Sequence, residues 1–426
     1  MILMQPAPGP LRGTVTVPGS KSLTNRALAV AAVADGHSVL RGALLADDTK
    51  VMVNALRQLG VSVLLDDGGE TVRIEGAGGP FPASSAHLDL GNAGTAVRFL
   101  LALCAAGRGT YVLDGVPRMR ERPQAPLLAA LRALGAETEA QFAPDCLPVT
   151  IHATGLAGGV VSLDGSVSSQ YFSALCQAAP LMANGLDLRV EGELVSRPYL
   201  DLTAEVMAVF GVAMVNESYG RFLVAPLQRY VGADYTLEPD ASSASYFWAA
   251  AALTGGRVTV AGLSRASRQG DVRFVDVLAQ MGCRVEESAA GLTVEGPAEL
   301  RGVELDLNEI SDTALTLAAL APFATSPTVV TGLAHARAQE SDRVTAMATE
   351  LQRLGARVEE LPDGWRIEPG PLQGARLQTY DDHRLAMSLA LVGLRVEGVQ
   401  IQGPECVGKT FPTYWQKLSA LVEGSV

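Results

Sequence analysis

Residues 22–34 read SLTNRALAVAAVA, a polar start followed by a helix of small apolar residues. The same design returns five more times at intervals of about 70 residues, and a regular interval of this kind is typical of repeat architectures. Because these helices are apolar on all sides, we expect them to be buried. The other five copies start at Asn92, Ser168, Ser242, Ser311 and Asp381.

Each of these helices begins a longer pattern. A glycine and a strand follow the helix, and then come a polar loop, a second helix and two short alternating strands, which predicts an α/β chain of repeated β-α-β-α-β-β units. Five of the second helices are followed by a glycine, as is typical of a left-handed helix cap. These glycines are Gly60, Gly135, Gly211, Gly282 and Gly355.

The six units predict two domains of three units each. The sixth unit lacks its last strand, and we expect residues 14–18 (TVTVP) to supply it from the other end of the chain. The first domain then covers residues 19–234, and the second covers residues 1–18 plus 235–426. Two chain crossings favour a hinge over a loose tether. We expect three helices to pack inward in each domain, with an active-site cleft between the two domains.

Composition excludes several classes of protein. The net charge of −12 argues against a nucleic-acid partner, and no apolar run approaches the ~18 residues that span a membrane. The start of the chain lacks the pattern of a secretory signal, and the five cysteines form no CxxC pair, so we expect a cytoplasmic protein. Neither metal-ligand spacing nor a dinucleotide fingerprint is found, and PGSKS lacks the P-loop glycine directly before lysine. We therefore expect no metal and no cofactor.

Cations gather at equivalent points of the repeat. Helix N-termini favour anions, so basic side chains near them predict sites for anionic groups. One such residue alone would more often be a solvated side chain or part of an ion pair. Seven of them are enough for two separate anions. They are Lys21, Arg26, Arg98, Arg122, Arg343, Arg384 and Lys409.

Two carboxylates and one histidine are candidates for proton transfer. Asp312 and Glu340 lie beside these cations, although an acidic residue that begins a helix is often only a cap. His383, between Asp382 and Arg384, is either a general acid or a structural residue. With Lys21, these three are the expected catalytic residues.

Ten motifs in order, from residue 11 to 421, resemble the EPSP synthase (3-phosphoshikimate 1-carboxyvinyltransferase) family of enolpyruvyl transferases. They include PGSKS, LGNAGTAVR, RMRERP, SRPYLDLT, QESDRV and YDDHRLAMSLA. The resemblance implies two inside-out α/β barrels. It also implies transfer of the enolpyruvyl group of phosphoenolpyruvate to the 5-hydroxyl of shikimate 3-phosphate, through a tetrahedral adduct. This is a step of the shikimate pathway of aromatic amino acid biosynthesis, and the family's known inhibitor is glyphosate.

The resemblance also implies roles for residues. Asp312 would accept a proton and Glu340 would donate one, and the enzyme would be a monomer that needs no cofactor. Shikimate 3-phosphate would be held by Lys21, Ser22, Arg26, Ser168, Ser169, Gln170, Ser196, Tyr199, Asp312 and Gln339. Phosphoenolpyruvate would be held by Lys21, Asn92, Gly94, Arg98, Arg122, Gln170, Arg343, Arg384 and Lys409.

Three residues depart from the family pattern. Gln339 stands where many members have lysine, His335 where many have asparagine, and Phe99 where several have proline. Two other functions stay open. One is the related transfer to a UDP-sugar, whose enzymes carry a loop cysteine that Cys146 and Cys406 do not match. The other is a non-catalytic six-repeat scaffold, in which Gln339 would mark lost activity.

Overall fold

The computed structural model describes residues 1–66 and 68–424 of a mixed α/β protein. The chain divides into two compact units, which are described separately. The inserted unit is Gly19–Leu237, and the terminal unit combines Met1–Pro18 with Glu238–Val426.

Five four-stranded sheets follow one pairing order. In each sheet the first two strands are parallel, and the third and fourth are antiparallel to their neighbours. The inserted unit holds three of them: β14 (Asp234–Thr236), β3 (His37–Arg41), β5 (Thr71–Glu75) and β4 (Ser62–Leu65); β6 (Ser85–Asp89), β7 (Arg108–Asp114), β9 (Val149–Thr154) and β8 (Glu137–Ala140); and β10 (Gly159–Asp164), β11 (Leu186–Glu191), β13 (Arg221–Val224) and β12 (Val215–Glu217).

The terminal unit holds the other two four-stranded sheets and a three-stranded sheet. The smaller sheet keeps the same order, a parallel pair followed by an antiparallel strand. The sheets are β2 (Arg12–Val15), β15 (Arg257–Ala261), β17 (Gly291–Glu295) and β16 (Arg284–Ser288); β18 (Glu304–Asp306), β19 (Thr328–Thr331), β21 (Gly364–Glu368) and β20 (Arg357–Leu361); and β22 (Arg376–Leu377), β23 (Gln400–Ile401) and β1 (Ile2–Leu3).

The strand expected at residues 14–18 has a different partner from the one predicted. It forms β2, which runs parallel to β15, and the short strand β1 pairs with β23 in the smaller sheet. The prediction was wrong because an alternating pattern fits the edge of any half-buried sheet. Because β14 pairs with β3 in the inserted unit, it does not pair with β15, and β2 can take the place of the parallel neighbour of β15. This pairing also carries the inserted unit to Leu237, beyond the expected boundary after residue 234.

The helices begin where polar side chains satisfy free backbone N–H groups. Ser20, Ser168, Asp240 and Asp382 each accept a hydrogen bond from an amide in the first turn of the helix that follows. The five glycines that follow the second helices all have positive φ, as a left-handed cap requires. The inserted unit contains α1 (Lys21–Val33), α2 (Asp47–Gln58), α3 (Gly94–Ala105), α4 (Pro117–Glu121), α5 (Ala125–Ala133), α6 (Ser169–Ala178) and α7 (Pro198–Val209). The terminal unit contains α8 (Ala241–Thr254), α9 (Phe274–Gln280), α10 (Ala314–Leu320), α11 (Arg343–Arg353), α12 (His383–Val392) and α13 (Tyr414–Val422).

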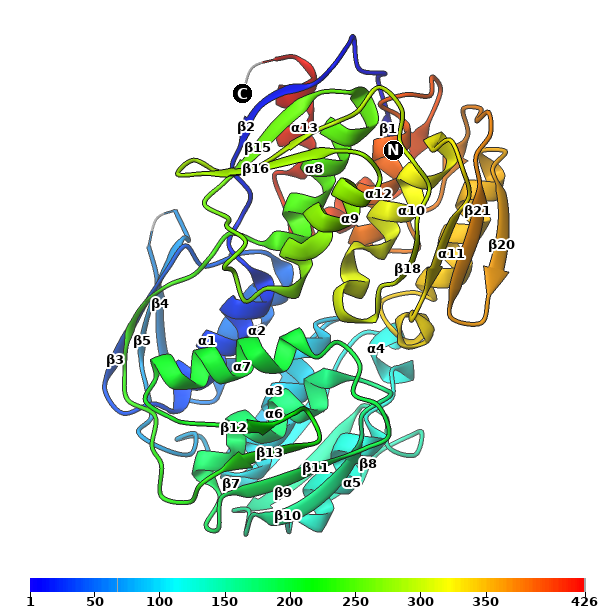
Figure 1. Ribbon diagram of the computed structural model, residues 1–426. Coiled ribbons are helices and arrows are strands. Elements are labelled where there is room, and N and C mark those ends of the chain that lie inside the picture. The colour runs from blue at the N-terminus through cyan, green and yellow to red at the C-terminus, as the bar shows by residue number, and fades with distance from the viewer. Residues whose placement is uncertain (67, 425–426) are drawn as a thin grey trace. The chain divides into compact units, whose positions relative to one another are not determined.

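The small-residue helices form the interior of each unit. In the inserted unit α3 packs on α1 and α6, and in the terminal unit α8, α10 and α12 pack on one another (Figure 1). Nearly every side chain of α3 and α8 is buried, as expected for helices that are apolar on all sides.

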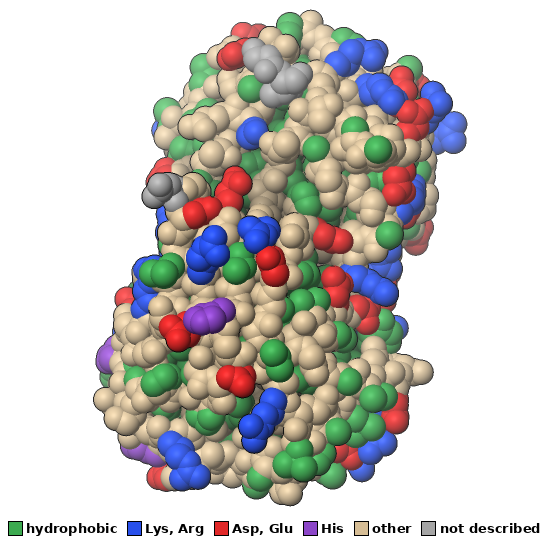
Figure 2. All heavy atoms as spheres, turned by 90° about the vertical axis from the view of Figure 1, so that its left-hand side faces the viewer, with side chains coloured by type: hydrophobic (Ala, Val, Ile, Leu, Met, Phe, Trp, Pro, Cys, Tyr) green, Lys and Arg blue, Asp and Glu red, His purple; other side chains and the backbone are tan. Residues whose placement is uncertain are grey.

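The described part of the chain has no membrane-spanning helix, and the face drawn in Figure 2 carries charges of both signs. None of the helices within residues 1–66 and 68–424 is both long and apolar enough to cross a bilayer. Acidic and basic side chains are interspersed over the face drawn in Figure 2. An anionic ligand must therefore be attracted by local groups of cations.

Candidate functional site

Arg26 on α1 joins three helices of the inserted unit. Its Nε donates to Thr203 Oγ1 on α7 at 2.9 Å, and its Nη2 donates to Ser173 Oγ on α6 at 3.1 Å and to the carbonyl oxygen of Tyr199 at 3.2 Å. The rings of Phe99 and Tyr199 lie 5.3 and 5.5 Å from the guanidinium carbon. Burial lowers the pKa of Arg26 to about 10, against a smaller opposing effect of Tyr199. These contacts hold α1, α6 and α7 against one another.

A second group, the Arg98–Arg122 cluster, consists of Asn92, Gly94, Arg98, Arg122 and Gln170. Arg98 Nη1 donates to Gln170 Oε1 at 2.8 Å, and Arg122 Nη1 donates to Asn92 Oδ1 at 3.3 Å. Both guanidinium groups are buried, and Arg98 Nε has no hydrogen-bond partner among the described residues. Buried donors are normally satisfied, so two neighbouring guanidinium groups of this kind suit an anionic ligand.

Gly94 is the residue that lets these two arginines approach the helix start. A Cβ atom at this position would lie 2.5 Å from Arg98 Nη1 and 2.7 Å from Arg122 Nη2. Such separations are below any ordinary van der Waals contact. Glycine at the first residue of α3 therefore lets both guanidinium groups lie where they do, and a side chain there would displace their ends.

The other candidate residues of the inserted unit lie at helix starts. Lys21 Nζ is 3.6 Å from Asp48 Oδ2, and Ser168 Oγ accepts from the amide of Gln170 at 3.3 Å. Ser196 has a φ of 53°, a left-handed conformation that is unusual for a residue other than glycine. Ser22, Ser169 and Tyr199 lie in the first turns of α1, α6 and α7.

The terminal unit brings its candidate residues together in one network. We call it the Asp312 cluster, and its members are Asp312, Glu340, Arg343, Asp382, Arg384 and Lys409. Arg343 lies at its centre: Nη1 donates to Asp312 Oδ1 at 3.1 Å, and Nη2 donates to Glu340 Oε2 at 3.1 Å. Its Nε donates to Asp382 Oδ2 at 2.8 Å. Burial by itself would lower the pKa of Arg343, but Asp382, Glu340 and Asp312 together raise it above the ordinary value.

Each of the two candidate carboxylates of this cluster contacts two cations. Asp312 also accepts from Arg384 Nη2 at 2.7 Å, and Glu340 accepts from Lys409 Nζ at 2.8 Å. Opposite charges at these distances attract each other, so each carboxyl group is held between its two cations. Gln339 accepts a hydrogen bond from Arg343 and so also belongs to the surroundings of Asp312 and Glu340.

The two histidines near this cluster differ in their surroundings. The side chain of His383 is completely buried, and its Nδ1 is 3.7 Å from Asp382 Oδ1. His335 Nε2 lies 3.0 Å from Ser311 Oγ. Burial lowers the pKa of His335, although the charge of Asp312 acts in the opposite direction.

Sequence reasoning missed two acidic residues of the terminal unit. Asp382 caps α12 and receives hydrogen bonds from Arg343 and Ser341. Asp271 is buried and accepts a hydrogen bond from the hydroxyl of Ser242. Adjacent acids at residues 381–382 and an acid in the motif QGDVRF were the available signals, but neither pattern reveals a buried partner.

The two clusters have different chemical capacities. The Arg98–Arg122 cluster offers cations and amide groups, which suits the binding of phosphate or carboxylate. The Asp312 cluster pairs carboxylates with cations, which suits proton transfer beside developing negative charge.

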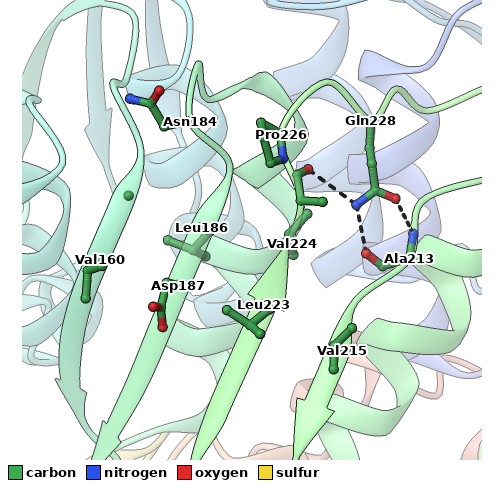
Figure 3. A pocket seen from close by; sticks show the side chains of 12 residues that line it. Val160, Asn184, Leu186, Asp187, Ala213, Val215, Leu223, Val224, Pro226 and Gln228 are labelled. Carbon is green, nitrogen blue, oxygen red and sulfur yellow. Dashed lines mark hydrogen bonds between the residues drawn. The ribbon is translucent and has the colours of Figure 1, made fainter.

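A hollow in the inserted unit lies apart from these residues. It covers one face of the sheet β10, β11, β13 and β12, where Val160, Asp187, Leu223 and Val215 follow one another across the four strands (Figure 3). Gln228 closes one end by donating to the carbonyl oxygen of Ala213 at 2.9 Å. No candidate residue lines this hollow, so it is not the candidate site.

Known proteins resemble this chain over nearly its whole length. The profile of the family EPSP synthase (3-phosphoshikimate 1-carboxyvinyltransferase) matches residues 6–418. Proteins named 3-phosphoshikimate 1-carboxyvinyltransferase from Nostoc punctiforme and Shewanella amazonensis are each 46% identical to it, with 97% of both chains covered. An EPSP synthase structure from Acinetobacter baumannii is 27% identical, with a TM-score of 0.83 over 98% of this chain and 97% of that one. These matches confirm the resemblance seen in the ordered motifs. This chain belongs to the EPSP synthase (3-phosphoshikimate 1-carboxyvinyltransferase) family.

Proposed function

We propose that this protein transfers the enolpyruvyl group of phosphoenolpyruvate to the 5-hydroxyl of shikimate 3-phosphate, releasing phosphate. The observation that carries the proposal is the family match over residues 6–418, together with 46% identity to proteins of that name. The two cation-rich clusters agree with it, since the substrates bring two phosphates and two carboxylates.

The inserted unit is proposed to bind most of shikimate 3-phosphate. The phosphate of this substrate would bind to Lys21 and to the hydroxyl groups at the start of α6, where backbone N–H groups and the helix dipole also favour an anion. Arg26 would act mainly by holding α1, α6 and α7 in register, because its Nε and Nη2 donate to protein partners. The remaining residues proposed for this substrate are Ser22, Ser168, Ser169, Gln170, Ser196, Tyr199, Asp312 and Gln339.

Phosphoenolpyruvate is proposed to bind to guanidinium groups of both units. These are the guanidinium groups of Arg98, Arg122, Arg343 and Arg384. Guanidinium groups bind carboxylate and phosphate in a planar, bidentate way, and they stabilise charge that develops as the adduct forms. Lys21, Asn92, Gly94, Gln170 and Lys409 complete this proposed set.

Asp312 and Glu340 are proposed to move the protons. Asp312 takes the proton of the attacking 5-hydroxyl, while Glu340 gives a proton to the methylene carbon, which becomes a methyl group. In the second half, the methyl group returns a proton to Glu340, the carbon–oxygen bond to phosphate breaks, and the enol double bond forms again. The departing phosphate takes the proton that Asp312 had accepted, so both carboxyl groups return to their starting state. Arg343 contacts both carboxylates at 3.1 Å and can respond to charge on either. The complete burial of His383 supports its structural role rather than that of a general acid.

We further propose that the common strand order reflects six copies of one β-α-β-α-β-β unit. Three copies would form each of two inside-out barrels, with helices inside and sheets outside. The shared pairing of five sheets and the buried helices α3 and α8 support this arrangement. Because the single chain supplies both clusters, we propose a cytoplasmic monomer that needs no cofactor.

The test is phosphate release by the purified protein. It is given phosphoenolpyruvate alone, with shikimate 3-phosphate, or with UDP-N-acetylglucosamine. Release only with shikimate 3-phosphate is expected; release only with the UDP-sugar would assign the related transferase, and none at all would favour the scaffold. Lys21→Met should abolish release, whereas the matched control Lys50→Met should not, since Lys50 is a half-exposed lysine on α2.

A further inference from the structure

Glu350 is a buried carboxylate that the proposed reaction does not use. Its side chain on α11 is completely inaccessible to solvent. Oε1 accepts from the hydroxyl of Tyr380 at 2.8 Å, and Oε2 accepts from the amide of Gln378 at 3.0 Å and from Arg353 Nε at 3.0 Å. Burial of a carboxylate is costly unless hydrogen bonds compensate it, and two of these three donors come from one segment, residues 378–380.

This segment has an unusual backbone. Tyr380 and Asp381 have φ values of 53° and 55°, so two consecutive residues other than glycine are left-handed. Such conformations persist only where the surrounding contacts fix them, and they are common next to functional groups. Thr379 contributes one of these contacts, because its carbonyl oxygen accepts from the amide of Asp382 at 2.8 Å. Glu350 contributes two more of these contacts, because it accepts hydrogen bonds from the amide of Gln378 and from the hydroxyl of Tyr380.

The segment leads directly into the Asp312 cluster. Asp382 follows the two left-handed residues, caps α12 and accepts from Arg343 Nε at 2.8 Å. Two residues later Arg384 donates to Asp312 Oδ2 at 2.7 Å. The direction in which these side chains leave the backbone therefore depends on the conformation of residues 380 and 381.

Helix α11 holds this segment at two points. Arg343, at its first residue, binds Asp382, and Glu350 binds Gln378 and Tyr380. Residues seven apart on an α-helix lie on the same face about two turns, or ~10 Å, from each other. One rigid face of α11 thus fixes both the entry to the left-handed turn and the acid that follows it.

We propose that Glu350 is a positioning residue, which acts through Tyr380 to hold the left-handed turn and thereby sets Asp382 and Arg384 in the Asp312 cluster. The effect on substrate rests on the proposed function, in which Arg343 and Arg384 contact phosphoenolpyruvate. Shikimate 3-phosphate has most of its proposed contacts in the inserted unit, so it should be affected less.

The first experiment is steady-state kinetics of Tyr380→Phe. This change removes only the hydroxyl that binds Glu350 and keeps the half-exposed ring. The KM for phosphoenolpyruvate is expected to rise about tenfold, the effect of losing one hydrogen bond to a charged group, while the KM for shikimate 3-phosphate stays within about twofold. Glu350→Gln should have a smaller effect, because its amide can still bond both Gln378 and Tyr380. Thr349→Ala is the matched control, since it removes a hydroxyl on the same helix that bonds to the carbonyl oxygen of Thr345 at 2.8 Å within α11, and it should leave both KM values unchanged.

A second experiment needs no activity. Hydrogen exchange of the amides of residues 378–386 is compared in wild-type protein and Tyr380→Phe, with thermal unfolding to confirm that both are folded. Faster exchange confined to this segment is expected. Unchanged exchange, or an unchanged KM for phosphoenolpyruvate, would overturn the proposal. Absence of phosphate release from the wild-type protein would instead refute the proposed function, and the exchange result would still decide the role of Glu350.

Discussion

Replacing Gly94 with alanine tests the geometry of the Arg98–Arg122 cluster. The added methyl group would lie 2.5 Å from Arg98 Nη1 and 2.7 Å from Arg122 Nη2, whereas ordinary contact begins at 3.4 Å. The two groups must therefore retreat by roughly 0.9 and 0.7 Å, the differences between these distances. Arg98 has little freedom to do so, because it is held by Gln170 and stacks on Tyr171 at 5.4 Å. A shift of this size is enough to break a charge-assisted hydrogen bond of about 2.8 Å.

The expected loss follows from one such bond. A hydrogen bond to a charged group contributes about 1.5–3 kcal/mol, so the KM for phosphoenolpyruvate should rise roughly 10- to 150-fold. Folding should not suffer, since alanine favours a helix over glycine by about 1 kcal/mol.

The assay is phosphate release at saturating shikimate 3-phosphate and varied phosphoenolpyruvate. Gly220→Ala serves as the control: it lies in the same unit, and the atom nearest to its added methyl group, Glu217 O, is 3.7 Å away. This control should behave as wild type. If Gly94→Ala kept a KM within twofold of wild type, the two arginines would not bind this substrate in the arrangement described.

Three further predictions concern other residues of the two units. Asp312→Asn should lower kcat by about 10²–10⁴-fold, as expected for loss of a general base, with an unchanged unfolding temperature in a thermal scan. Arg26→Met should destabilise the protein by about 3 kcal/mol in a denaturant titration, because it leaves buried hydroxyl groups without their donor. Burial, and next the charge of Asp312, raises the pKa of Asp271 to about 7. Its stabilising contribution is therefore complete below the usual Asp pKa near 3.8 and is lost as pH rises towards 7, so Asp271→Asn should gain stability relative to wild type between pH 5 and pH 8 in calorimetry.

For each of these three predictions, one result would contradict the reasoning. Near-normal turnover by Asp312→Asn would remove its role as the base. An unaltered denaturant midpoint for Arg26→Met would show that the three helices do not depend on its hydrogen bonds. A constant stability difference between Asp271→Asn and wild type across that pH range would mean that Asp271 is ionised throughout.

Local chemistry made much of the fold predictable. Polar caps such as Ser168 and Asp382 act on amides two or three residues away, so helix starts can be read from the sequence. The pairing partner of a strand cannot be predicted in the same way. Residues 14–18 alternate well enough to complete several sheets, and the two residues of β1 are too few to show any pattern, so their pairing depends on the tertiary fold.

The site residues were harder to predict, because the sequence does not show which polar side chains are buried. Lys21, Arg343 and Arg384 could be singled out because motifs contain them, but the sequence does not distinguish a binding arginine from a structural one such as Arg26. Glu350 lies in none of the motifs, and the sequence does not distinguish it from a surface acid of a helix. Its importance arises from contacts with residues 378–380, which no local pattern predicts.

The pairing of β2 with β15 has a consequence for synthesis of the chain. Arg12 pairs with Arg257, so at roughly 5–20 residues per second the first strand leaves the ribosome some 10 to 50 s before its partner exists. During that interval the whole inserted unit, Gly19–Leu237, is produced, and its own edge strand β14 arrives at its end. The inserted unit is therefore translated completely before the terminal unit. Until β15 has been translated, strand β2 in the first 18 residues has no partner with which to form its sheet.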